Sequence, residues 1–93
     1  MKVETYIVMN RTEIEANIPY KIVAEVIGGA KWNTGRRKRL MNESFTLTER
    51  NAIYKIYSQA RSWYLVKGLP DELRITPHIL RLWHRLANFC CEI

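Results

Sequence analysis

The chain has 93 residues, of which 47% are hydrophobic, 26% charged and 11% aromatic. This length predicts one domain, residues 1–93, with a single modest core, and it excludes two independent cores. The aromatic content excludes the composition of a disordered chain. Fifteen Lys and Arg against nine Asp and Glu give a formal net charge of +6, which favours an anionic partner.

The sequence predicts an intracellular protein. The first residues, MKVETYIVMN, lack the basic and long apolar regions of a signal peptide, and no apolar run approaches the ~20 residues that cross a bilayer. Cys90 and Cys91 are adjacent, so they cannot form an ordinary unstrained disulfide. We therefore expect a reducing, cytoplasmic location and no membrane partner.

The N-terminal segment predicts a strand. Residues 2–9, KVETYIVM, alternate in polarity and are rich in β-branched and aromatic types. A strand needs a partner, and the sequence does not identify one.

Residues 12–28 fit two structures. Thr12 and Glu15 have the spacing of a capping box, and Pro19 would break or restart a helix. Helix is also favoured by apolar residues that recur every four positions, namely Ile14, Ile18, Ile22 and Val26. The alternative is a buried strand over residues 20–27, YKIVAEVI, followed by a glycine turn.

The C-terminal half predicts two amphipathic helices. The first would begin after a Thr48 cap and run to about Lys67, and the second would begin with Thr76 as cap and Pro77 at its first position. Each has one apolar face: Ile53, Ile56, Tyr57, Ala60, Trp63 and Tyr64 on the first, and Ile79, Leu82, Trp83, Leu86, Phe89 and Cys90 on the second. Matched faces indicate an antiparallel helical hairpin over residues 48–91 that supplies most of the core.

A second, smaller apolar set lies off these faces, namely Tyr54, Leu65, Leu80, Ala87 and Cys91. Either the N-terminal segment covers it or a partner binds there, with Tyr54, Leu65 and Leu80 as the partner-binding candidates. The overall prediction is an α-rich α+β fold with a short N-terminal strand, a middle segment and this hairpin.

The middle segment, YKIVAEVIGGAKWNTGRR over residues 20–37, resembles the helix-turn-helix of small DNA-binding proteins. Ala24 and Gly28 stand at the spacing of that family's small residue and turn glycine, with Val23 and Ile27 at apolar positions before them. The resemblance implies that residues 31–37 form the recognition segment. Thr34 and Gly35 depart from the family, which has a β-branched apolar residue there. The alternative is a strand, a loop carrying Trp32 and a basic segment.

A basic cluster of four consecutive residues, Arg36, Arg37, Lys38 and Arg39, is the main binding candidate. Guanidinium groups bond phosphate oxygens in pairs, so the cluster predicts contact with nucleic-acid phosphates. The preceding residues are candidates for base or shape contacts: Lys31, Trp32, Asn33 and Thr34. Trp32 would stack on a base or anchor the core. Four further cations could widen the surface: Arg50, Arg61, Arg81 and Arg85.

No pattern in the chain indicates catalysis, a metal or a cofactor. Two cysteines and two histidines in unsuitable positions do not make a structural zinc site, and GGAK lacks the spacing of a phosphate-binding loop. Cys90 falls on the predicted core face, which argues against a nucleophile. We therefore expect a non-enzymatic protein.

Two functions follow from these observations. The first is a small basic nucleic-acid-binding protein with a regulatory role, acting on DNA or RNA. The second is a small phage or mobile-element inhibitor or adaptor that binds a host protein or a nucleoprotein complex, like those that block CRISPR effectors. Self-association is compatible with both.

Overall fold

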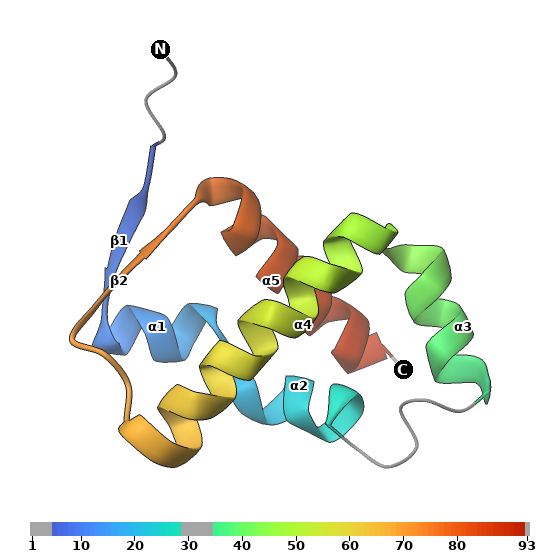
Figure 1. Cartoon of the computed structure of the whole chain (residues 1–93), viewed down its shortest axis with the longest axis horizontal. Helices are drawn as coiled ribbons and strands as arrows, with labels where there is room; N and C mark the ends of the chain where they lie inside the picture. The colour runs from blue at the N-terminus through green and yellow to red at the C-terminus, as the bar shows by residue number, and fades with distance from the viewer. Residues whose placement is uncertain (1–4, 29–34, 93) are drawn as a thin grey trace.

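The computed structural model describes residues 5–28 and 35–92, arranged as Figure 1 shows. In chain order the elements are β1 (Ile7–Asn10), α1 (Arg11–Asn17), α2 (Tyr20–Ile27), α3 (Gly35–Ser44), α4 (Leu47–Ser62), the π-helical η1 (Trp63–Lys67), β2 (Glu72–Ile75) and α5 (Pro77–Glu92). The predicted α-rich α+β class is confirmed, because helices dominate and a short antiparallel sheet joins the N-terminal strand to the C-terminal half.

The sheet pairs β1 with β2, and its register sets Ile7 opposite Ile75 and Asn10 opposite Glu72. Its inner face carries Met9 and Ile75, which are 2% and 7% exposed, because successive side chains of a strand point to opposite sides. Of the predicted strand over residues 2–9, residues 7–9 lie in β1, Thr5 and Tyr6 do not, and residues 2–4 are outside the described residues. Its partner β2 is the element that the sequence pattern did not identify.

The chain is helical from Arg11 to Ile27, with a break at Ile18 and Pro19. Proline cannot donate the backbone hydrogen bond that a continuous helix requires, so α2 begins anew after Pro19. The strand alternative for residues 20–27 is wrong. The apolar face that the four-residue spacing predicted turns toward the core: Ile14, Ile18 and Val26 are buried, and Ile22 is half-buried.

The capping box of α1 is formed by Asn10 and Glu13, and the predicted pair Thr12 and Glu15 is wrong. The Glu13 backbone N–H donates to Asn10 Oδ1 at 2.9 Å, and the Asn10 N–H donates to Glu13 Oε1 at 3.3 Å. Strand β1 ends at Asn10, so the same residue closes the strand and opens the helix.

Helix α4 begins two residues earlier than predicted, because Thr46 and not Thr48 is its cap. The Glu49 N–H donates to Thr46 Oγ1 at 3.2 Å and the Thr46 N–H donates to Glu49 Oε1 at 2.9 Å. Thr46 has a glutamate three positions later, whereas Thr48 has Asn51, which explains the choice. At α5 the prediction is confirmed, because Thr76 Oγ1 accepts from the Ile79 N–H at 3.3 Å and Pro77 is the first helical residue.

The core lies where α5 crosses α4 and α2 (Figure 1). Trp83 is 1% exposed, and it is the largest of the fully buried side chains. The predicted face of α5 is buried except for the half-buried Ile79. On α4 and η1 only Ile53 and Ala60 of the predicted face are buried, and the other four are half-buried at the margin of the core.

Helix α3 lies at the end of the molecule opposite the sheet (Figure 1). Met41 and Phe45 anchor its C-terminal end, at 1% and 4% exposure, and the Phe45 ring meets Phe89 of α5 edge to face with centroids 5.7 Å apart. Within the described ranges, no helix combines the length and apolar composition that crossing a bilayer requires.

Candidate nucleic-acid interface at helices α3 and α4

The basic cluster occupies the first turn of α3. Consecutive residues of a helix are separated by about 100° around its axis, so the four cations cannot share one face. Arg36, Lys38 and Arg39 are exposed to solvent. Arg37 is on the side of the helix that carries Met41 toward the core. The cluster therefore displays cations in several directions from one end of the molecule.

Lys38 borders a cavity of about 160 Å³ between α3 and α4. The other lining residues are Met41 and Asn42 from α3, and Leu47, Arg50, Asn51 and Tyr54 from α4. Phe45 and Thr46 connect the two helices. The cavity thus combines two cations, two side-chain amides and a tyrosine that is 41% exposed.

The guanidinium of Arg50 is held in place beside α3. Its Nη1 donates to Asn42 Oδ1, which fixes the orientation of the guanidinium group. Its Nε is buried and has no acceptor among the described residues. Because a guanidinium carries five N–H donors, Arg50 retains hydrogen-bonding capacity for a further acceptor.

The predicted wider patch is divided by the fold. Arg85 pairs with the Glu49 carboxylate, donates to the Ser44 carbonyl at 3.0 Å and lies 4.9 Å from the centre of the Phe45 ring. It therefore fastens α5 to the α3–α4 connection. Arg50 joins the cavity described above, Arg61 lines a separate cavity beside Leu65, and Arg81 is exposed on α5.

Glu49 is held in its ionised form by its surroundings. The Thr46 backbone N–H, followed by the Arg85 side chain, holds the pKa of this carboxyl below its usual range. Because Arg85 neutralises it, Glu49 adds little repulsion toward an anion approaching α4.

Four predicted contact residues, Lys31, Trp32, Asn33 and Thr34, lie outside the described residues. They belong to the stretch 29–34 between α2 and α3, which also contains the turn of the helix-turn-helix resemblance. The helix-turn-helix assignment therefore stays a prediction.

The three partner-binding candidates do not lie together. Tyr54 is in the α3–α4 cavity, whereas Leu65 is 61% exposed in η1 and lines the cavity next to Arg61. Leu80 is half-buried and contacts the core. The neighbour of Leu65, Val66, is 80% exposed, and the sequence analysis did not single it out.

A stack of three tyrosines was also missed. The ring of Tyr20 lies between those of Tyr57 and Tyr64, with centroids 5.9 and 5.2 Å apart and planes within 12° of parallel. Tyr64 donates from its hydroxyl to the Ile18 carbonyl at 3.0 Å, and burial raises the pKa of both Tyr57 and Tyr64. In the sequence, the only signal of this stack was the seven-residue spacing of Tyr57 and Tyr64. The tyrosine between them, Tyr20, comes from α2, and no local pattern indicates that contact.

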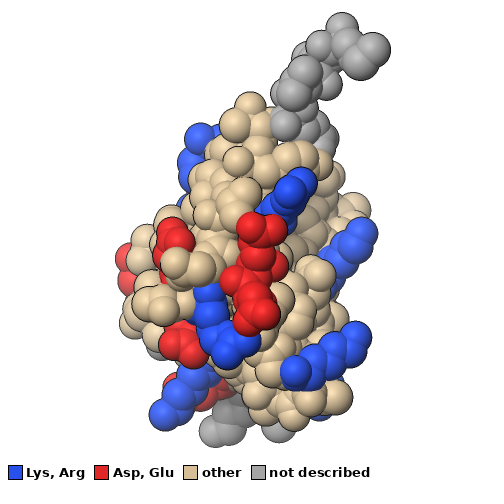
Figure 2. Space-filling view, turned by 90° about the vertical axis from the view of Figure 1, so that its left-hand side faces the viewer, with Lys and Arg blue, Asp and Glu red and all other residues tan. Residues whose placement is uncertain are grey.

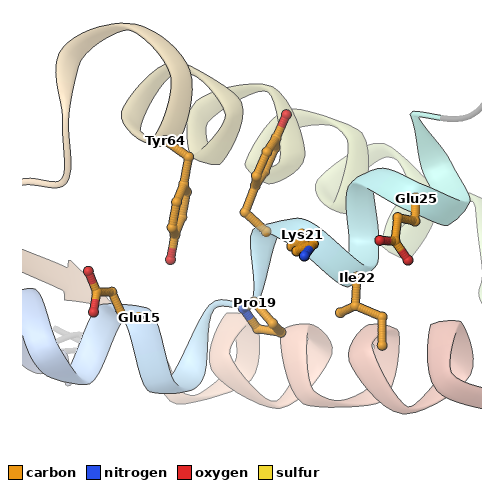
Figure 3. Close-up of a pocket in the computed structure, with 7 residues that line it drawn as sticks. Glu15, Pro19, Lys21, Ile22, Glu25 and Tyr64 are labelled. Atoms are coloured by element: carbon orange, nitrogen blue, oxygen red, sulfur yellow. The ribbon is translucent and has the colours of Figure 1, made fainter.

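The α1–α2 junction beside this stack forms an open hollow (Figure 3). Tyr64 reaches down from above it, Glu15 and Glu25 stand at its two ends, and Lys21 lies between them. The face around the sheet likewise mixes both signs of charge (Figure 2), and Arg11 pairs there with Asp71. Neither surface has the one-signed character expected of a phosphate-binding face.

Of the two cysteines, Cys90 is buried and Cys91 is exposed. Burial, followed by the neighbouring Cys91, raises the pKa of Cys90 to about 11, so its thiol stays protonated near neutral pH. Among the described residues, no group of three or more His, Cys, Asp and Glu side chains lies together as a metal site would require.

Comparison of the chain with protein-family models, with curated proteins and with solved structures found no match.

Proposed function

We propose that this is a small, non-catalytic nucleic-acid-binding protein, with a regulatory role, that contacts its target through α3 and the N-terminal half of α4. The observation that carries the proposal is the cavity in which Lys38 and Arg50 lie beside Tyr54. The net charge of +6 supports it, since phosphates supply most of the affinity in such complexes.

Each lining residue has a role that its chemistry permits. A phosphate would be bound between the Lys38 ammonium and the Arg50 guanidinium, which Asn42 orients. Asn42 and Asn51 offer amide donors and acceptors to a base edge or a sugar. The half-exposed ring of Tyr54 offers a surface on which an unpaired base can stack.

The outward residues of the cluster would extend the contact. Arg36 and Arg39 are exposed on α3 and would meet neighbouring phosphates without carrying sequence information. The resemblance to a helix-turn-helix would place residues 31–37 in contact with the bases, which stays a prediction.

The proposal is tested by fluorescence anisotropy against labelled duplex DNA, single-stranded DNA and structured RNA, each over a salt series. The double variant Lys38→Gln with Arg50→Gln keeps polar side chains at both positions. For duplex DNA we expect it to lower the salt slope by about 0.9 for each phosphate that the protein no longer neutralises, and to weaken binding accordingly.

The matched control is Lys21→Gln with Lys67→Gln, which removes the same charge from exposed positions outside the cavity. If both double variants lower binding equally, the effect is one of net charge and the proposed interface is wrong. A preference for single strands that disappears on Tyr54→Ala would identify stacking as the selective contact.

A second candidate function is an inhibitor or adaptor that binds a host protein or a nucleoprotein complex. It is favoured by Leu65 and Val66, which are 61% and 80% exposed in the π-helical η1, an irregularity often associated with functional sites. Capture of a host protein that survives removal of the Lys38 and Arg50 charges but not Leu65→Ser with Val66→Ser would support it. For either function we infer a cytoplasmic location, because the adjacent cysteines are both free thiols.

A further inference from the structure

We propose that a second cavity, enclosed by α4, β2 and α5, binds a small apolar carboxylate. Its volume is about 250 Å³, and it is separate from the α3–α4 cavity because the two share no lining residue. The proposal does not depend on nucleic-acid binding.

The walls of this second cavity are mainly apolar and come from several elements. The apolar side chains include Ile56 and Trp63 from α4 and η1, Leu73 and Ile75 from β2, and Ile79 and Trp83 from α5, and the polar residues Gln59 and Thr76 also line the cavity. Ile75 and Trp83 are buried, and β2 is fixed by its ladder with β1, so the walls are built on paired and packed elements. A preformed apolar cleft with a few polar groups is the usual form of a small-molecule site.

Trp83 is a buried residue of this wall. Although it is 1% exposed, its indole N–H has no acceptor among the described residues. Buried donors are almost always paired in folded proteins, so an unpaired one is a reason to look for a missing acceptor. Trp83 forms part of the cavity wall, but its Nε1 atom has less than 1 Å² of accessible surface, so a ligand oxygen would reach it only if neighbouring side chains move.

The charges at the cavity indicate an anion. Lys55 and Arg74 line it and are exposed, and no carboxylate stands among its described lining residues. The hollow at the α1–α2 junction differs in this respect, since Glu15 and Glu25 flank Lys21 there. A carboxylate on the rim could therefore bind both cations without competition from an acidic neighbour in the wall.

The size limits the ligand. A volume of about 250 Å³ falls just below the range of roughly 300–1,000 Å³ that is typical of drug-sized ligands. The ligand class is therefore a monocarboxylic acid with one aromatic ring or a short aliphatic chain. The probe that we choose is 4-phenylbutyrate, and its neutral counterpart is 4-phenylbutanol.

The test is a titration of the whole protein with each probe, followed by ¹H–¹⁵N and methyl NMR spectra. We expect 4-phenylbutyrate to shift the Trp83 indole signal and the methyl signals of Ile56 and Ile79, and to bind roughly tenfold more tightly than the alcohol. Signals of Leu65, which lies outside the cavity, should not move. Absence of saturable shifts at the cavity residues would overturn the proposal.

Two variants separate the anion contact from the apolar one. Lys55→Gln with Arg74→Gln should bring the acid and the alcohol to nearly equal affinity, whereas the charge-matched Lys21→Gln with Arg81→Gln should keep the tenfold preference. Ile56→Phe should fill the cavity and abolish binding of both probes. If that variant does not fold, Ile79→Phe serves for the same test. Equal acid preference in both charge variants would show that Lys55 and Arg74 do not hold the carboxylate.

Discussion

Replacing Gly28 with alanine should test how tightly α2 fits against α4. Gly28 has φ −82° and ψ −8°, a right-handed conformation that alanine adopts without strain. The backbone alone therefore predicts that Gly28→Ala stabilises the protein, by about 0.4–1 kcal/mol, because alanine restricts the unfolded chain. The surroundings predict the opposite.

A Cβ atom at position 28 would stand 2.5 Å from the Tyr57 hydroxyl oxygen and 2.8 Å from the Ala24 carbonyl oxygen. Tyr57 cannot easily turn away, since its ring stacks on Tyr20. Overpacking of this kind typically costs about 1–3 kcal/mol. After the entropic gain is subtracted, we expect Gly28→Ala to lower the free energy of unfolding by about 1–2 kcal/mol.

The measurement is equilibrium urea denaturation of four proteins: the parent, Gly28→Ala, Tyr57→Phe and the double variant. Tyr57→Phe removes the hydroxyl oxygen that the new methyl group would meet, so the double variant should recover about 1 kcal/mol of the destabilisation. A Gly28→Ala protein at least as stable as the parent would refute the argument from close approach. Additive effects in the double variant would show that Tyr57 is not the obstacle.

Three further predictions concern the caps, the pH dependence and the thiols. Thr46→Ala should lower the free energy of unfolding by about 1 kcal/mol in chemical denaturation, whereas Thr48→Ala, within the first turn of the same helix, should change it by less than about 0.5 kcal/mol. The pKa of Glu49 is lower in the folded than in the unfolded protein, so its contribution to stability is present above the unfolded pKa and disappears as pH falls through the folded value. Glu49→Gln should therefore reduce the loss of stability at acidic pH, measured as a pH series of thermal melts. The exposed Cys91 should react with a thiol reagent in the native protein, whereas the buried Cys90 should react only on unfolding, which mass spectrometry of the labelled peptide would distinguish.

The helix starts show both the reach and the limit of sequence reasoning. Thr76 followed by Pro77 is an unambiguous start, because the two residues favour adjacent positions of the same cap, and it was placed correctly. Thr46 and Thr48 are both acceptable caps when considered singly. The reciprocal bond to Glu49 decides between them, and its signal was in the sequence, since Thr46 has a glutamate three positions later and Thr48 has Asn51.

Only one of the two strands of the sheet could be predicted from the sequence. The strand pattern over residues 2–9 includes residues 7–9 of β1, whereas the four residues of β2 follow Pro70 and Asp71 and are too few to show a period. Their pairing depends on a contact between residues far apart in sequence, which local pattern does not encode.

The candidate interface was predicted as a cluster but not as a cavity. The run Arg36–Arg39 is visible in the sequence as four adjacent cations, yet only Lys38 of the four lines the cavity in the folded chain. Arg50 and Tyr54 join it because α3 and α4 lie against each other in the folded chain, where the Phe45 ring also contacts Phe89 of α5. Such an arrangement follows from tertiary packing, so sequence reasoning assigned Arg50 and Tyr54 to different candidate sets.

The pairing of β1 with β2 has a consequence for biosynthesis. A ribosome that adds about 5–20 residues per second completes α1 and α2 several seconds before residues 72–92 exist. During that interval Ile14 and Val23, which are fully buried in the finished protein, lack α5 and the sheet partner that holds β1. We therefore expect the nascent N-terminal third to expose these apolar side chains until α5 is complete, and slow translation of the central helices would prolong that exposure.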